Sequence, residues 1–361
     1  MKKINNLEIS ALVAIITNTM YSGININLIK NSTRTNSWIS IIISYLIGII
    51  PLILYLYISK YEEKLPLKDK IAKLFKSTHY IINPVLNIIL AIIGITIIYN
   101  ISNFITSQLL YRTPQIIIGI LLTILVIYNV TKGINTITRV SLIMTFFNIF
   151  LFLVSFFALI KHINLENFLP ILKNNTSCII PNALKLASIN VLPLILLLCI
   201  PKENTEKPEK YSKYIILSYI ISSLISFLIF FATYGILGTY LTNIFEYPEY
   251  IVLKKVVLFG FLERIENIVS NQWLVGNYIY LTIIIYYLST SSCLSKKINN
   301  KFLSLIIGIT LLILSTIIFK SSTIFNNYIK TYFPYITASL FIIYLIITLK
   351  IFITKKIIEF N

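Results

Sequence analysis

The chain has 361 residues, of which 57% are hydrophobic and only 12% charged, and its mean hydropathy is +0.84. A soluble globular domain carries about 25% charged residues, so this composition excludes that class and indicates an integral membrane protein. The net charge of +18 is divided among the segments between apolar runs, which argues against a nucleic-acid-binding surface.

Ten apolar runs follow one another along the chain, each near the roughly 20 residues that a helix needs to cross a bilayer. They predict an all-α integral membrane protein with ten transmembrane helices and no large soluble domain. The runs cover residues 8-30, 38-59, 81-110, 114-131, 139-160, 180-200, 212-237, 262-291, 302-319 and 333-353.

The first run is expected to remain in the protein as a helix, because Asn18, Tyr21 and Asn25 interrupt it and no small-residue cleavage pattern follows. Within its polar segment TNTMYSGININ, Gly23 follows Ser22. Glycine relaxes the backbone at its own position, so we expect this helix to be broken there.

Residues 60-80 form the longest polar loop, in which Leu67, Ile71, Leu74 and Phe75 recur at helical spacing. The loop is rich in lysine, which is typical of the cytoplasmic side of a membrane. This pattern predicts a basic amphipathic helix lying on the inner leaflet.

The third run carries Tyr99 and Asn103 four residues apart, so both lie on one face of the expected helix, with Gln108 about one turn further. Such side chains line a cavity in some bundles and form hydrogen bonds between helices in others. The spacing leaves both interpretations open.

The sixth run contains LASINVLP, where Ser188 and Asn190 precede Pro193. Proline lacks a backbone donor and clashes with the preceding turn, so it predicts a break in this helix as well. Lys185, about one turn inside the run, either extends to the outer interface or faces a ligand cavity.

The segment at residues 201-213 is short, polar and interrupted by prolines, and five apolar runs lie on each side of it. Because an odd number of spans reverses orientation, residues 1-160 and 180-353 are compatible with an inverted repeat. Secondary transporters with this plan bind ligands at broken points of corresponding helices in the two halves.

Breaks near Gly23 and Pro193 leave amides and carbonyls that another helix, water or a ligand must satisfy. The amino-terminal end of a half-helix attracts a carboxylate, and the carboxyl-terminal end attracts an ammonium group. Together the two breaks predict a zwitterion site. Alternatively, Gly23 marks a close helix contact and Pro193 only a kink.

The segment FLERIENIVSNQW leads into the eighth run with three charges, Glu263, Arg264 and Glu266, in four residues. Acidic side chains in a first turn complement the helix dipole, which fits a capped helix entering from the outer surface. The polar stripe continues to Trp273 and Asn277, which alternatively approach the ligand site.

The remaining reactive side chains favour neither an enzyme nor a metal or cofactor site. If the amino terminus is cytoplasmic, about two thirds of the lysines and arginines lie inside, which places both termini in the cytoplasm. His79 and His162 then lie at opposite faces and share no site. Cys178, Cys199 and Cys293 are odd in number and widely spaced, and no nucleotide-binding or hydrolase motif occurs.

Three segments resemble one family, the spore germination permeases, which are the B-subunits of nutrient germinant receptors within the amino acid-polyamine-organocation superfamily. FLERIENIVSNQW resembles the family's phenylalanine-leucine-glutamate-arginine signature followed by a tryptophan. Residues 113-140 resemble its fourth helix and the following connection, and residues 163-175 resemble the segment before its sixth helix. The resemblance covers the whole chain. SINVLP departs from the family's phenylalanine- and glycine-rich break ending in glutamate, which predicts a different ligand or a less open break.

The resemblance implies a LeuT-like fold, a 5+5 inverted repeat with broken helices 1 and 6. It also implies an amino acid site between these helices, with contributions from the third and eighth. On this sequence the implied ligand-binding residues are Asn18, Tyr21, Ser22, Gly23, Tyr99, Asn103, Ser188, Ile189, Asn190 and Asn277.

The function implied by the resemblance is nutrient sensing that triggers germination, in the spore inner membrane or cell membrane. The implied partners are an A-type membrane subunit with soluble domains and a C-type lipoprotein. The alternative is a proton- or sodium-coupled amino acid transporter. Glu8, Glu263 and Glu266 lie near helix ends, which leaves no evident proton carrier, but neutral oxygens could still bind sodium.

Overall fold

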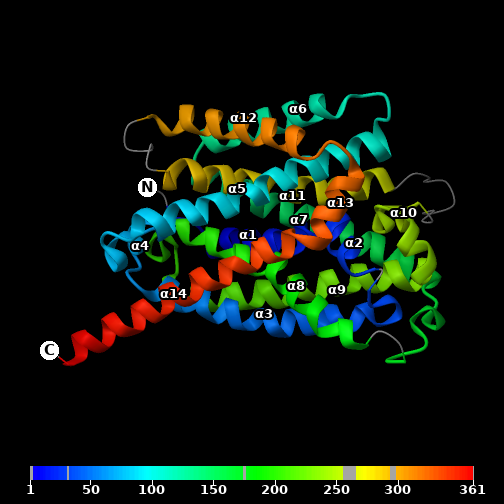
Figure 1. The fold of residues 1–361 in the computed structure, drawn as a ribbon, viewed down its shortest axis with the longest axis horizontal. Coiled ribbons are helices and arrows are strands. Elements are labelled where there is room, and N and C mark those ends of the chain that lie inside the picture. The colour runs from blue at the N-terminus through cyan, green and yellow to red at the C-terminus, as the bar shows by residue number, and fades with distance from the viewer. Residues whose placement is uncertain (1–2, 31, 174–175, 255–265, 293–297, 361) are drawn as a thin grey trace.

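The computed structural model describes residues 3–30, 32–173, 176–254, 266–292 and 298–360. Within them the fold is helical, and the one β feature is an isolated bridge between Ile4 and Thr205. Long helices lie side by side along the longest axis of the molecule (Figure 1). The expected all-α class is confirmed.

The helices of the first half are α1 (Asn6–Thr19), α2 (Ile26–Ile29), α3 (Ser37–Lys60), α4 (Leu67–Phe75), α5 (His79–Phe104), α6 (Gln115–Thr131) and α7 (Ile134–Leu159). Those of the second half are α8 (Ile179–Asn190), α9 (Tyr211–Ile244), α10 (Pro248–Leu253), α11 (Glu266–Ser291), α12 (Asn300–Ile318), α13 (Ser322–Thr331) and α14 (Phe333–Phe360).

Eight helical segments of the described residues are long and apolar enough to cross a membrane. A ninth, α6, is shorter, with 17 residues. The tenth expected span corresponds to α11, and the segment before it, including Glu263 and Arg264, lies outside the described residues. The chain is therefore a multi-pass membrane protein, while the count of ten stays a prediction.

The outward faces of the long helices are as apolar as their buried faces. Leu121 and Leu125 on α6 and Phe150 on α7 are each more than half exposed. In water such surfaces would aggregate, whereas a bilayer covers them. The helices must then be held together by close packing and by hydrogen bonds between polar side chains.

Both predicted helix breaks are present. Gly23 has φ +74° and lies in a π-helical turn, Tyr21–Asn25, between α1 and α2. These three segments form helix 1. α8 ends at Asn190, and a 3-10 segment, Leu192–Cys199, follows with Pro193 in its first turn. α8 and this segment form helix 6. Glycine tolerates the left-handed backbone and proline cannot continue the α-helical ladder, so both breaks have local causes.

The packing of the helices is symmetric between the two halves. α1 packs against α9 and α7, while α8 packs against α3 and α14. If each span of the first half is matched to the span five places later, the contacts of α1 become the contacts of α8. The matched helices α5 and α11 also pack against each other, as do α6 and α12. This is the pattern of the expected 5+5 inverted repeat. The boundaries at 1-160 and 180-353 stay a prediction.

α4 forms as expected, but it does not lie with its apolar face in the inner leaflet. Leu67 and Ile71 are fully buried, and Leu74 nearly so, within the main core of the bundle. The apolar face of this short helix therefore covers the ends of other helices instead of lipid. Burial against protein satisfies the same hydrophobic drive that favours an interfacial helix.

Two lysines of α4 cap the ends of two other helices. The Lys70 ammonium donates to the carbonyls of Ile58 at 3.0 Å and Ser59 at 3.2 Å, at the end of α3. Lys68 donates to the carbonyl of Thr290 at 3.2 Å, at the end of α11. Cations at helix carboxyl ends are favourable, so α4 ties α3 to α11.

The two termini lie near one end of the bundle. In Figure 1, α1 begins and α14 ends at the same side as α4, whereas α2, α10 and α13 lie at the opposite side. The amide of Ile4 also donates to the carbonyl of Asn204 at 2.8 Å in the connector between the halves. This arrangement agrees with an even number of spans between the termini.

Candidate functional site

The break in helix 1 is held by a carboxylate from α10. The amide of Gly23 donates to Oε1 of Glu249 at 2.7 Å, and Glu249 is only 9% exposed. A Cβ atom on Gly23 would lie 2.7 Å from the ring of Tyr247 and 2.8 Å from Oδ1 of Asn100. Glycine is thus required here both for its backbone angle and for the space.

The segment before α10 covers one side of this break. Asn27 donates to the carbonyl of Glu246 at 2.8 Å. Asn103 of α5 donates to the hydroxyl of Tyr247 at 2.9 Å and to the carboxylate of Glu246 at 3.1 Å. α2 and α5 therefore hold the same short loop, which closes the break from the side where α10 lies.

A direct hydrogen bond joins the two broken helices. The side-chain amide of Asn25 donates to Oδ1 of Asn190 at 2.8 Å, and both residues are almost completely buried. Asn25 lies just after the break in helix 1, and Asn190 is the last residue of α8 before the break in helix 6. The two breaks are consequently coupled without a ligand.

Aromatic rings surround the carboxyl-terminal end of α1. The ring of Phe104 lies 5.0 Å from that of Tyr247, 5.3 Å from Tyr250 and 4.7 Å from Trp273, with the planes close to perpendicular. The indole of Trp273 donates from Nε1 to the carbonyl of Thr19 at 3.1 Å. This bond satisfies one of the free carbonyls at the end of α1.

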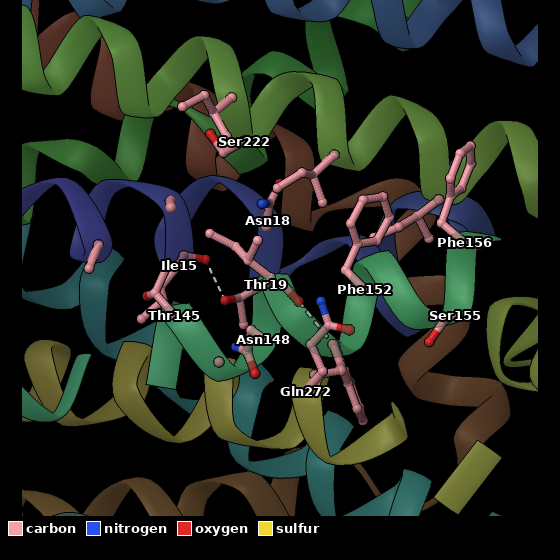
Figure 2. A pocket seen from close by; sticks show the side chains of 18 of the residues that line it. Ile15, Asn18, Thr19, Thr145, Asn148, Phe152, Ser155, Phe156, Ser222 and Gln272 are labelled. Carbon is pink, nitrogen blue, oxygen red and sulfur yellow. Dashed lines mark hydrogen bonds between the residues drawn. The ribbon is translucent and has the colours of Figure 1, made fainter. Parts of the chain in front are cut away.

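A cavity of about 400 Å³ lies beside the break, lined by α1, α7, α9, α10 and α11. Figure 2 shows labelled side chains of several of these helices around it. Its walls are mainly apolar, and its end near α10, which becomes the outer end if the termini are cytoplasmic, reaches Phe104, Glu249 and Trp273. Among the described residues that line it, Glu249 is the one charged side chain. Other polar lining residues include Asn18, Thr19, Thr145, Asn148 and Gln272.

Four of the expected site residues lie at the breaks or the cavity. Asn18 lines the cavity and accepts a hydrogen bond from Ser226. Gly23, Asn103 and Asn190 take part in the contacts described above. That these residues bind a ligand stays a prediction.

Other expected site residues point elsewhere. Tyr99 packs against Phe325, with ring centroids 4.6 Å apart. Ser188 donates to the carbonyl of Pro334 at 3.0 Å, on the side of α14. Ile189 and Asn277 are fully buried, and Asn277 donates to a carbonyl of its own helix.

Some expectations concern residues at the limits of the described structure. The side chains of Tyr21, Ser22 and Glu266 lie outside the described residues. Lys185 places its ammonium 5.9 Å from the ring of Tyr335 and does not line the cavity. That position fits the interpretation in which Lys185 extends toward the outer interface.

Glu249 was missed by sequence reasoning, which considered only Glu8, Glu263 and Glu266 as acidic side chains near the spans. It lies in the segment EYPEY between two apolar runs, 226 positions from Gly23. The available signal was the combination of proline, tyrosines and acids in an otherwise apolar region. It indicates a structured loop, but not that the loop folds back onto helix 1.

Two broken helices packed at the centre of an inverted repeat define a transporter-type fold. The structure is similar to Mhp1, a nucleobase-cation-symport-1 family transporter, in a closed conformation with bromovinylhydantoin bound. The TM-score is 0.66 at 11% identity, over 91% of this chain and 75% of that one. A Na+-coupled sialic acid symporter matches with a TM-score of 0.67 at 15% identity, over 93% and 78%. The LeuT-like fold is confirmed.

The family follows from sequence comparison. The family model for spore germination proteins matches residues 6–324, and the chain belongs to this family, whose members are not enzymes. It is 23% identical to spore germination protein XB of Bacillus anthracis, over 98% of this chain and 99% of that one. It is also 25% identical to spore germination protein A2 of Bacillus subtilis (strain 168), over 69% and 68%. The expected family is confirmed.

Proposed function

We propose that the chain is the nutrient-sensing membrane subunit of a spore germinant receptor and binds an amino acid beside the break in helix 1. The observation that carries this proposal is the cavity of about 400 Å³ that ends at Glu249, the residue that holds the amide of Gly23. Ligand sites are typically concave, mostly apolar and supplied with few polar groups. A ligand there would contact the break directly.

Binding would be reported as a change in the packing of helices 1 and 6. The bonds from Gly23 to Glu249 and from Asn25 to Asn190 define one arrangement of the breaks. A ligand that interacts differently with this arrangement and with an alternative one shifts the equilibrium between them, by its difference in affinity for the two. The signal would pass to an A-type membrane subunit and a C-type lipoprotein.

The proposed location is the spore inner membrane, with both termini in the cytoplasm. The lysine-rich loop supports this orientation by the positive-inside rule, since α4 lies at the same end of the bundle as the ends of α1 and α14 (Figure 1). In this orientation α10 and the outer end of the cavity face the side from which nutrients arrive.

The second candidate is an ion-coupled transporter of amino acids. Glu249 supports proton coupling, because a buried carboxylate beside a ligand cavity is a candidate proton carrier. Sodium coupling has less support, since transporters of this plan hold sodium at carbonyls of broken helices, and here the carbonyl of Thr19 already accepts a hydrogen bond from the indole of Trp273.

Reconstitution in liposomes separates the two candidates. Binding of labelled amino acid without accumulation, under either a proton or a sodium gradient, supports sensing. Accumulation that follows the proton gradient and disappears in Glu249→Gln supports transport. The sensing proposal fails if the wild-type chain accumulates amino acid against its gradient.

A further inference from the structure

The outer end of the cavity combines three features that each favour a positive charge. We propose that it is an ammonium-binding site, with Glu249 as its anionic wall, for primary amines that carry an apolar body, apolar amino acids included. The inference rests on the proposed nutrient-binding function and specifies how the ligand is recognised.

The first feature is the carboxylate. Glu249 lines the cavity and is 9% exposed, so its interaction with a bound cation is weakly screened by water. Its Oε1 atom is fixed by the amide of Gly23 at 2.7 Å. The side chain of Glu249 would therefore connect a bound cation to the backbone amide of Gly23 at the break in helix 1.

The second feature is the end of α1. Its 14 residues end at Thr19, which also lines the cavity. The carboxyl-terminal end of a helix carries a partial negative charge from its aligned peptide dipoles, and this field remains when the carbonyl of Thr19 accepts from the indole of Trp273. Because Thr19 and Glu249 border the same cavity, the helix end and the carboxylate attract a cation to one region.

The third feature is the aromatic wall. Phe104, Tyr250 and Trp273 all line the cavity. The centroid of the Phe104 ring lies 5.3 Å from that of Tyr250 and 4.7 Å from that of Trp273. Aromatic faces attract ammonium groups, and several rings together form the cages that bind them best. The Lys254 ammonium, which does not line the cavity, lies 4.9 Å from the centroid of the Tyr250 ring, so Phe104 and Trp273 are the rings left for a bound ammonium.

The rest of the ligand is specified by the remaining walls. Ile149, Phe152 and Phe156 of α7 and Ala14 of α1 line the cavity away from Glu249, which suits an apolar side chain. The amide of Gly23, the donor that a ligand carboxylate would be expected to use, is held by Glu249. Recognition should thus depend on the ammonium group more than on the carboxylate.

Matched triples of small molecules test this directly on the full chain in lipid nanodiscs. For alanine the probes are L-alanine, ethylamine and propionate, and for leucine they are L-leucine, 3-methylbutylamine and 4-methylpentanoate. In at least one triple the amino acid and the amine should bind and the acid should not. Glu249→Gln should weaken both by about tenfold or more, the usual effect of removing a charge-assisted contact.

Glu166→Gln is the matched control, because Glu166 is exposed and does not line the cavity; binding by this variant should equal that of wild type. If Glu249→Gln fails to fold, Phe104→Leu removes part of the aromatic wall and should weaken amine binding about two- to fivefold.

The inference is overturned if the acids bind as tightly as the amines, or if folded Glu249→Gln binds amines with unchanged affinity. It is also overturned if no triple binds while an uncharged nutrient such as a sugar does, an outcome that leaves the proposed sensing function standing. If no nutrient of any class binds, the proposed function fails as well.

Discussion

Asn25 and Asn190 are 165 positions apart, yet their side chains meet at 2.8 Å and join the two broken helices. Both residues are buried, so the hydrogen bond forms in a low-dielectric region where losing it is costly. In an inverted repeat the two breaks are the elements whose relative position changes between states. The hydrogen bond between Asn25 and Asn190 is therefore characteristic of one of these states.

Removing this bond should shift the response without abolishing it. Asn190→Ala should change the amino acid concentration for half-maximal germination about fivefold, since a net hydrogen bond contributes about 1 kcal/mol. Because the two residues act as a pair, the double variant with Asn25→Ala should show the same shift and not the sum. Ser291→Ala is the control, as it removes a 2.7 Å bond to Asn87 between α11 and α5, on neither broken helix, and should leave the concentration unchanged.

Gly23→Ala should abolish the response. The new methyl group would overlap the ring of Tyr247 and Oδ1 of Asn100, and the left-handed angle adds about 1 kcal/mol of strain or more. Gly133→Ala is a matched control, because Gly133 has φ +87° but open space around it. Backbone strain should lower the free energy of unfolding of Gly133→Ala by a similar amount, as measured by thermal unfolding, and spores with this variant should still germinate. Equal germination by both variants would show that the space around Gly23 is unimportant.

Lys70 should make the stability of the chain depend on pH. Burial lowers the pKa of the Lys70 ammonium from 10.5 to about 8. Between these values the unfolded chain holds a proton that the folded chain has lost, so the free energy of unfolding rises with pH across this window. Below pH 8 the cost of burying the charge is fully present. The rise is at most about 3 kcal/mol.

Thermal unfolding in detergent between pH 7 and about 10 measures this rise relative to variants. The free energy of unfolding of wild type minus that of Lys70→Met should increase steadily above pH 8. Lys64→Met changes a side chain that is 79% exposed, so its free energy of unfolding should depend on pH in the same way as that of wild type. Parallel curves for Lys70→Met would show that α4 does not bury this charge against the end of α3.

Ligand binding should not require sodium. The indole of Trp273 donates to the carbonyl of Thr19, the kind of acceptor that holds sodium in coupled transporters of this plan. Binding of labelled amino acid should therefore be the same in equal concentrations of sodium and potassium chloride. Tighter binding in sodium would place a cation near the break and favour the transporter interpretation.

The helix breaks and the membrane spans could be predicted from the sequence, because their causes are local. Gly23 and Pro193 break their helices through their own geometry, and the apolar runs define their own spans. The family motif around FLERIENIVSNQW supported the fold even though much of that segment lies outside the described residues.

Side-chain partners could not be predicted in the same way. One residue along a helix turns a side chain by about 100°, so the uncertain ends of the third and sixth helices left open which neighbour Tyr99 and Ser188 would face. They face α13 and α14 respectively. Glu249 depends on the return of α10 onto helix 1, a tertiary contact that no local pattern of the sequence specifies.

The most direct test of the account is whether the cavity holds the nutrient. Asn148 lines the cavity on α7, and Asn148→Trp would fill much of it, whereas Phe150 on the same helix is 62% exposed on the outer surface. Binding of labelled amino acid to the chain in nanodiscs should be lost in Asn148→Trp and retained in Phe150→Trp. Undiminished binding by a folded Asn148→Trp protein would contradict the account.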